Sequence, residues 1–316
     1  MDQNLNQSIE AIIPTAGRAA VLYKTLESMA QQVVLPTLVH IIDASDDTST
    51  ELVCKKISEL FPLKIKYYKA EIKGAAAQRM QAMPFIRSEF TLFTDDDIIL
   101  EQDCIQQLQN LLLSKREAGG VNAMVTNQQY HKPGRVTAFM YKLMNGSALK
   151  TYAGKCIGPA WNLLPEENGE LVNETEWLNT TCTLYRTLAL PEPLFPPIFQ
   201  GYSLMEDLAL SLEVKKCWRL YNVPSAKIFH DSQSGDHKNS AFKISKMEMI
   251  NRHYIIKNIL RRKGFTDYIK FFIFESWNII SSLNTSKGRQ SFFKTLSGKF
   301  SAFFYIIFNP KQSRNK

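Results

Sequence analysis

Short apolar runs alternate with segments of helical periodicity through the first hundred residues of this 316-residue chain. The runs lie at 9–13, 38–42, 65–68 and 89–93, and between them apolar residues recur every three or four positions, as on one face of a helix. Parallel strands need helical crossovers between them, so this alternation predicts an α/β fold with a mostly parallel sheet flanked by helices.

The remainder of the chain gives weaker signals of secondary structure. A threonine-rich run at 178–185 and the run at 219–223 indicate strands, and residues 205–217 indicate a helix. Clusters of glycine, proline and polar residues interrupt most of the stretch from 120 to 200. From about residue 241, basic and aromatic residues dominate with helical periodicity, which predicts a separate helical region.

Residues with chemical function follow directly after several predicted strands or open the next helix. They are Thr15, Asp43, Gly74 and the acidic triplet Asp95–Asp97. In an open parallel sheet the ligand binds at the carboxyl ends of the strands. The sequence therefore predicts a binding site at this edge of the sheet.

The acidic triplet is the sharpest of these features. Three adjacent carboxylates repel one another unless a cation neutralises them, and a divalent cation that carries a diphosphate would do so. In extended chain Asp95 and Asp97 point to the same side. A solvated acidic turn that caps the following helix is the alternative, and the position directly after a strand favours the site.

Four other positions are weaker candidates. Asp43 suits a base or ribose contact, although taken alone an N-cap or Asx turn is the commoner role of such an acid. Arg79, one turn into a small-residue helix, suits phosphate or the metal-binding carboxylates, with a solvated position on a packed helix as the alternative. Glu206 and Asp207 open a helix, where acids are expected from the helix dipole alone. His230 becomes a ligand candidate only with a metal nearby.

The composition is that of a globular protein, with 45% hydrophobic and 22% charged residues. The net charge of +8 favours anionic partners without choosing between them. Five scattered cysteines predict neither a disulfide framework nor a zinc site, which fits a reducing compartment. The polar start predicts no signal peptide, and no apolar run reaches the roughly 20 residues that cross a bilayer.

The motifs in their order resemble the family 2 glycosyltransferases, whose fold is the Rossmann-like GT-A type. The resemblance spans roughly residues 9–230. It is carried by AIIPTAGR at 11–18, VHIIDASDDTST at 39–50, KGAAAQRM at 73–80, FTLFTDDDIIL at 90–100 and GYSLMEDLALSLEVKKCWRLYNVPSAKIFH at 201–230.

The resemblance implies roles for individual residues. Those that would bind the nucleotide are Pro14, Thr15, Asp43, Arg79, Asp95 and Asp96. Asp97 would coordinate Mn²⁺ or Mg²⁺, and His230 matches a histidine that helps to bind metal or diphosphate. Asp207, in a Glu-Asp motif, would be the catalytic base.

The predicted function is inverting transfer of a sugar from a nucleoside-diphosphate sugar to a glycan or lipid-linked glycan. A sugar nucleotidyltransferase is one alternative, although residues 12–20 hold too few glycines to wrap a triphosphate. A non-catalytic basic protein that binds membrane or nucleotide is another. The acidic triplet argues against nucleic acid as a partner.

The predicted domain organisation places the catalytic domain at 1–240, with a nucleotide-sugar half at about 9–120 and an acceptor half at 121–240. The C-terminal region 241–316 is basic and aromatic, which fits an interfacial helix on an anionic membrane. We therefore expect a cytoplasmic enzyme that is peripheral at the inner face of the membrane. Packing of these helices on the catalytic domain or on a second subunit, in a homo-oligomer, is the alternative.

Overall fold

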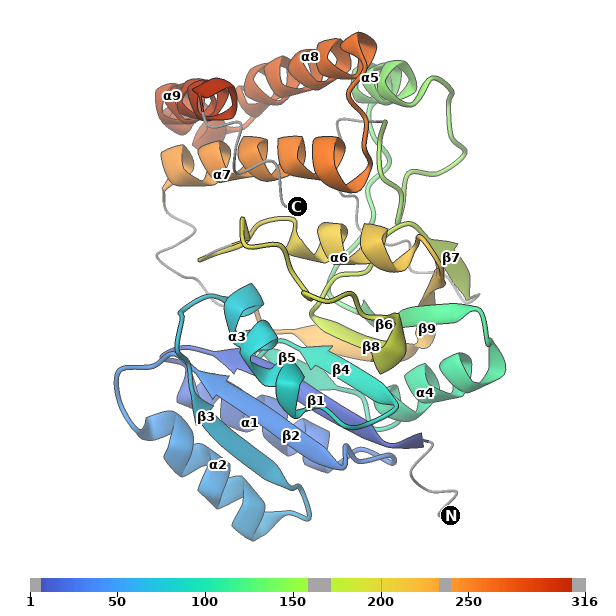
Figure 1. Ribbon diagram of the computed structural model, residues 1–316, viewed down its shortest axis with the longest axis vertical. Helices are drawn as coiled ribbons and strands as arrows, with labels where there is room; N and C mark the ends of the chain where they lie inside the picture. Colours follow the sequence, from blue (N-terminus) through green and yellow to red (C-terminus); the bar gives the residue numbers. More distant parts are fainter. Residues whose placement is uncertain (1–6, 159–171, 200, 233–239, 309–316) are drawn as a thin grey trace. The chain divides into compact units, whose positions relative to one another are not determined.

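The computed structural model describes residues 7–158, 172–199, 201–232 and 240–308 (Figure 1). The chain divides into two compact units, each described by itself below. The first unit comprises residues 1–130 and 165–233, and the second comprises residues 131–164 and 234–316.

A single sheet organises the described part of the first unit. Its strands lie in the order β3-β2-β1-β4-β8-β6-β9-β5, and β7 pairs with β9. The strands β3, β2, β1 and β4 are mutually parallel, whereas β8 is antiparallel to both of its neighbours. The bounds are β1 Ile9–Thr15, β2 Leu38–Asp43, β3 Ile65–Lys69, β4 Phe90–Thr94, β5 Ile98–Leu100, β6 Ala118–Val125, β7 Asn173–Thr175, β8 Cys182–Arg186 and β9 Arg219–His230.

Helices cover both faces of this sheet, which is why β1 and β4 are buried along their whole length. Helix α4 packs on β6, β8 and β9, and α3 packs on β1 and β2. The bounds are α1 Ala19–Ala30, α2 Ser49–Leu60, α3 Ala75–Ala82, α4 Cys104–Ser114 and α6 Glu206–Val214, with short 3-10 turns η2 Met83–Phe85 and η3 Thr187–Ala189. The prediction of an α/β fold is confirmed.

The strand β6 was not predicted, because its sequence AGGVNAMV contains two glycines and lacks a strong strand pattern. The packing around it accounts for one of them. A Cβ at Gly120 would lie 2.6 Å from the ring of Tyr185 on β8. Glycine is therefore required where a large side chain crosses a strand closely.

The second unit is helical in its described part. It contains α5 Arg135–Asn145, α7 Ala241–Tyr254 with a π-helical end η5 Ile255–Ile259, α8 Phe265–Ser282 and α9 Ser286–Phe308. The C-terminal helices agree with the prediction. Residues 131–158, which the prediction placed in an acceptor-binding half, pack in this unit: Tyr141 and Met144 share a small core with Phe274 of α8. Among the described helices, none is both long and apolar enough to cross a bilayer.

Four buried or half-buried charges join α7, α8 and α9. Glu275 of α8 accepts hydrogen bonds from Arg252 of α7 and from Lys299 of α9, the latter with an Nζ–Oε2 distance of 2.5 Å. Glu248 of α7 accepts from the same two cations at 2.8 Å each. Because both cations and Glu275 are at least 95% buried, each charge depends on the others for compensation.

We therefore expect Glu275→Ala to lower the free energy of unfolding by about 3–5 kcal/mol, because Arg252 and Lys299 would remain buried against one carboxylate. Denaturant unfolding followed by circular dichroism measures the loss. Glu213→Ala, which breaks the more exposed pair with Lys216, is the control and should cost less than about 1 kcal/mol. Similar losses in both variants would contradict a stabilising role for the cluster.

Candidate functional site

The carboxyl ends of β1, β2 and β4 meet at one edge of the sheet in the first unit. The parallel register places Pro14 beside Ile42 and Thr15 beside Asp43. The side-chain amide of Gln78 on α3 fixes both strand ends, since it donates to the backbone oxygens of Thr15 at 2.9 Å and of Ile42 at 2.6 Å. The residues predicted after separate strands thus lie together, as a parallel sheet requires.

A group of three potential metal ligands lies at this edge. Asp95, Asp97 and His230 each offer a ligand atom, and these atoms lie within 4.8 Å of one another. The Oδ1 of Asp97 is 3.1 Å from Nε2 of His230. Antiparallel pairing of β5 with β9, with Ile98 opposite His230, brings together residues 133 positions apart.

This donor set fits the divalent cation that the sequence predicted. Two carboxylates and one imidazole are ligands that Mn²⁺ accepts. Diphosphate oxygens of the donor would supply further ligands. The strand pairing holds His230 in place, and its backbone N–H and C=O both bond to the side chain of Asn127. The ligand atoms are therefore already gathered without large rearrangement of the backbone.

Arg18 is a site residue to which the sequence analysis gave no role. Its guanidinium contacts Asp96 at 2.6 Å and Asp97 at 3.1 Å, so it neutralises part of the acidic triplet. It follows Gly17, whose φ of 66° turns the chain after β1. The sequence feature that could have identified Arg18 is its position as a basic residue directly after the turn that ends the first strand.

The three members of the acidic triplet have different environments. Asp96 is fully buried, accepts a hydrogen bond from the hydroxyl of Thr15 at 2.6 Å, and burial raises its pKa to about 6. Asp97 is buried but contacts His230, and Asp95 is partly exposed. In this conformation the side chain of Asp96 is bound to Thr15 of β1. Asp95 and Asp97 are the two members of the triplet that, with His230, could coordinate a metal ion.

Asp43 is also fully buried. One of its oxygens accepts from the backbone N–H and the hydroxyl of Ser45, and the other accepts from the hydroxyl of Tyr67 at 3.0 Å. Ser45 in turn accepts from the backbone N–H of Gly17 at 2.7 Å. Asp43 therefore orders the two loops after β1 and β2.

Arg79 connects the acidic triplet to the start of α6. Its side chain is 99% buried, and its guanidinium donates to Asp95 at 2.7 Å and to Glu206 at 2.9 Å. The segment before α3 also approaches the segment before α6, because Gly74 forms a β-bridge with Gly201. A Cβ at Gly74 would lie 2.6 Å from the carbonyl oxygen of Gly201, so this approach requires glycine.

The segment that leads into α6 has an unusual backbone. Gly201, Ser203 and Met205 have φ angles of 64°, 50° and 71°, and such conformations in residues other than glycine store strain of about 1–3 kcal/mol each. The helix begins directly afterwards with Glu206 and Asp207. Strain of this kind is common where a loop must present side chains in one fixed geometry.

The two acids of this helix start differ in their partners and in their proton affinity. Burial raises the pKa of Glu206 to about 8, with Arg79 opposing that shift, and its Oε1 is engaged by Arg79. Burial raises the pKa of Asp207 to about 6, and its Oδ1 accepts from the backbone N–H of Leu208 at 2.7 Å. Burial therefore favours the protonated form of Glu206 more strongly than that of Asp207.

Comparison with solved structures shows the fold. The mannosyltransferase PcManGT from Pyrobaculum calidifontis, in complex with GDP-Man and Mn²⁺, has a TM-score of 0.56 at 13% identity and covers 96% of this chain and 88% of its own. S. aureus TarS 1–349 has a TM-score of 0.54 at 15% identity, covering 93% and 80%. GalNAc-T7 with UDP, GalNAc and Mn²⁺ has a TM-score of 0.53 at 12% identity, covering 81% and 48%.

The chain spans 43% of a longer TarS chain. No curated protein matches the sequence. The family model Glycosyl transferase family 2 matches residues 10–158, which include β1 to β4, Arg18, Arg79 and the acidic triplet. This match favours glycosyl transfer over the nucleotidyltransferase alternative. Residues 10–158, somewhat less than half of the chain, thus match glycosyl transferase family 2.

Proposed function

We propose that this family 2 enzyme transfers a sugar with inversion from a nucleoside-diphosphate sugar to a glycan or lipid-linked glycan acceptor, with Asp207 as the general base. The observation that carries the proposal is the link through Arg79. One guanidinium contacts both Asp95, beside the predicted metal ligands, and Glu206, next to Asp207. Arg79 thereby fixes the predicted metal ligands of the donor site relative to the start of α6, which carries the proposed base.

The donor side consists of the residues at the sheet edge. Asp97 and His230, with Asp95 beside them, would hold Mn²⁺ or Mg²⁺, which when bound neutralises the charge that develops on the leaving diphosphate. Arg18 adds a second positive charge next to Asp97. Pro14, Thr15 and Asp43, at the ends of β1 and β2, would shape the pocket for the base and ribose together with Arg79, Asp95 and Asp96.

Relatives of the same fold bind different nucleotides. TarS 1–349 is described in complex with UDP-GlcNAc, and PcManGT in complex with GDP-Man. Both are nucleoside-diphosphate sugars, which supports that class of donor for this chain.

On the acceptor side, Asp207 is better suited than Glu206 to remove a proton. A general base must be an ionised carboxylate, and burial raises the pKa of Asp207, to about 6, less than that of Glu206. The acceptor hydroxyl oxygen forms a bond to the anomeric carbon, the bond from that carbon to the diphosphate breaks, and the hydroxyl proton passes to Asp207. A single displacement of this kind inverts the anomeric centre.

The proposed class of acceptor also suggests where in the cell the enzyme acts. A lipid-linked glycan is met at a membrane surface, and the net positive charge of the chain favours an anionic one. We therefore propose peripheral binding at the inner face of the cytoplasmic membrane.

We expect a nucleoside-diphosphate sugar to stabilise the protein against heat only when Mn²⁺ or Mg²⁺ is present. A donor at 100 times its dissociation constant should add about 2.7 kcal/mol. A screen over uridine, guanosine and thymidine donors, with and without EDTA, measures this effect. Turnover with an acceptor should release nucleoside diphosphate, and release of pyrophosphate or the absence of any metal-dependent stabilisation would contradict the proposal.

A further inference from the structure

The two units of the chain carry charges of opposite sign. The second unit has 21 Lys and Arg residues against 4 Asp and Glu, a net charge of +17, whereas the first has 17 against 26, a net charge of −9. Two of the four acids in the second unit, Glu248 and Glu275, are held by Arg252 and Lys299. The exposed charge of the second unit is therefore overwhelmingly positive.

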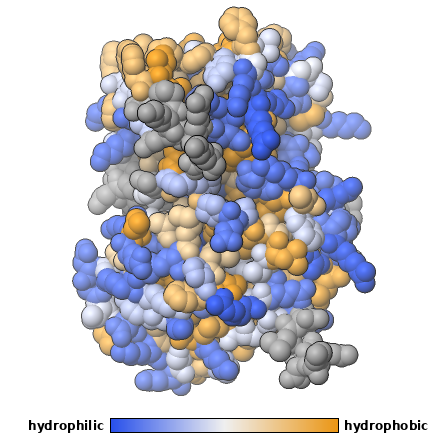
Figure 2. Space-filling view, viewed as in Figure 1, coloured by the Kyte–Doolittle hydropathy of each residue, from blue (hydrophilic) through white to orange (hydrophobic). Residues whose placement is uncertain are grey.

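The same unit exposes a disproportionate number of large apolar side chains. Of the 25 in the described part of the chain, 14 lie in this smaller unit, and seven of these are phenylalanines. Figure 2 shows apolar side chains gathered over α8 and α9. Soluble proteins rarely expose apolar residues in such concentration without an interaction partner.

On α9 these side chains form one stripe. Phe293, Phe300, Phe304 and Phe308 are 80%, 57%, 54% and 72% exposed, and their spacings of seven, four and four residues place them on one helix face. The buried residues Gly298, Lys299 and Ala302 lie on the opposite face. This face of α9 therefore packs inside the unit, and the phenylalanine stripe points outward.

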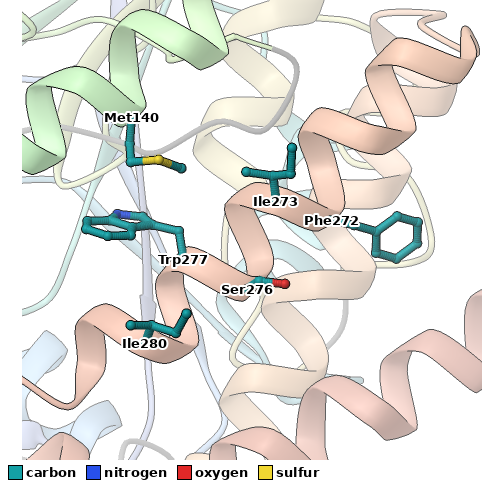
Figure 3. A pocket seen from close by; sticks show the side chains of 6 residues that line it. All are labelled: Met140, Phe272, Ile273, Ser276, Trp277 and Ile280. Carbon is teal, nitrogen blue, oxygen red and sulfur yellow. The ribbon is translucent and has the colours of Figure 1, made fainter.

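Helix α8 has a second exposed stripe, which includes Phe265, Ile269, Ile273 and Ile280 and recurs at the same helical period. Beside it, a groove of about 400 Å³ lies between α8 and α5 and is lined by Met140, Phe272, Ile273, Ser276, Trp277 and Ile280. Figure 3 shows Met140 of α5 directed toward Trp277. Five of the six lining residues are apolar.

We propose that the second unit docks on an anionic phospholipid bilayer, with the α9 phenylalanine stripe and the α5–α8 groove inserted among the acyl chains. The inference rests on the proposed function in that a lipid-linked acceptor would be met there. It also extends the membrane-binding region to α5, which the sequence analysis had left outside. Exposed basic residues of α5 and α9 and of the loop between α7 and α8, including Lys142, Arg261, Lys263, Arg289 and Lys294, would contact lipid phosphates.

The charge and the apolar surface of the second unit together favour an anionic bilayer over a second copy of the chain and over a soluble polyanion. A second copy of the unit would also carry +17, so like charges would oppose one another across a dimer interface. A soluble polyanion would satisfy the basic residues but would leave the phenylalanine stripe in water. An anionic bilayer offers both phosphate charge and hydrocarbon to the same surface.

Trp277 provides a direct test because it lines the groove. The full chain is mixed with vesicles of phosphatidylcholine containing 30% phosphatidylglycerol, in which the acyl chains are brominated. We expect Trp277 fluorescence to be quenched, and the difference between the wild-type protein and Trp277→Phe isolates this residue among the four tryptophans. Pure phosphatidylcholine vesicles should give little quenching.

A pair of matched variants tests the stripe. Phe304→Glu and Leu52→Glu both place an acid at an exposed apolar helix position, in α9 and α2 respectively. We expect Phe304→Glu to weaken partitioning to the anionic vesicles by about tenfold or more, through loss of apolar insertion and repulsion by anionic lipid. Leu52→Glu should leave it unchanged.

Three outcomes would overturn the docking proposal. They are equal partitioning of the two variants, binding to heparin or polyphosphate without any bromine quenching, and a dimer in solution that Phe304→Glu dissociates. Metal-dependent donor stabilisation, measured without vesicles, reports on the proposed sugar transfer separately. A protein that binds donor but not vesicles would refute the docking alone.

Discussion

Replacement of Asp207 by Asn is expected to leave donor binding intact and to lower turnover by about 10²–10⁴-fold or more. The amide has nearly the shape of the carboxylate and can still accept a hydrogen bond from the backbone N–H of Leu208, so α6 should begin as before. It cannot accept the proton of the acceptor hydroxyl. Turnover with saturating donor, metal and acceptor, together with donor stabilisation, separates the two effects.

Glu206→Gln is the matched control for this substitution. Burial raises the pKa of Glu206 to about 8, which makes it a poorer base than Asp207, and the amide keeps an acceptor oxygen for Arg79. We expect turnover to fall much less than in Asp207→Asn. A larger loss in Glu206→Gln than in Asp207→Asn would assign the base to Glu206 instead.

The same assignment predicts the pH profile of turnover. Burial raises the pKa of Asp207 from 3.8 to about 6, so below this pH the carboxyl is protonated and cannot act as a base. With donor and metal saturating, turnover should fall about tenfold per pH unit below 6 and level off above neutrality. A flat profile between pH 5 and 7 would contradict the assignment.

Replacement of Asp97 by Ala is expected to abolish metal-dependent donor binding. Asp97 lies between His230 at 3.1 Å and Arg18 at 3.1 Å, and no other carboxylate in the described part of the chain has this pair of contacts. In the wild-type protein, donor at 100 times its dissociation constant should add about 2.7 kcal/mol of stability. In the variant this increment should disappear.

Asp46→Ala is the control for Asp97→Ala. Asp46 is an exposed acid in the loop after β2, and the described residues give it no contact with the metal ligand group. It should retain the full metal-dependent increment. If Asp97→Ala also retains it, the metal is held elsewhere and the grouping of Asp95, Asp97 and His230 has another role.

The sequence alone determined the fold class and the position of the candidate site along the chain. The strands β1 to β4 begin and end within two residues of the predicted runs, because apolar periodicity is local information that a buried strand must carry. Parallel connectivity then brings the ends of those strands to one edge. That rule is enough to place Thr15, Asp43 and the acidic triplet together from the sequence alone.

The charge pairs that organise the site were decided only by the tertiary structure. Arg79 meets Glu206 across 127 positions, and Arg18 meets Asp97 across 79. Neither pair has a local signature, because an arginine after a turn or an acid at a helix start is compatible with a solvated face. Burial decides whether such a side chain forms an ion pair within the site or stays in solvent. It is a property of the packed fold, and it raises the proton affinity of Glu206 above that of Asp207, which adjacency in sequence could not distinguish.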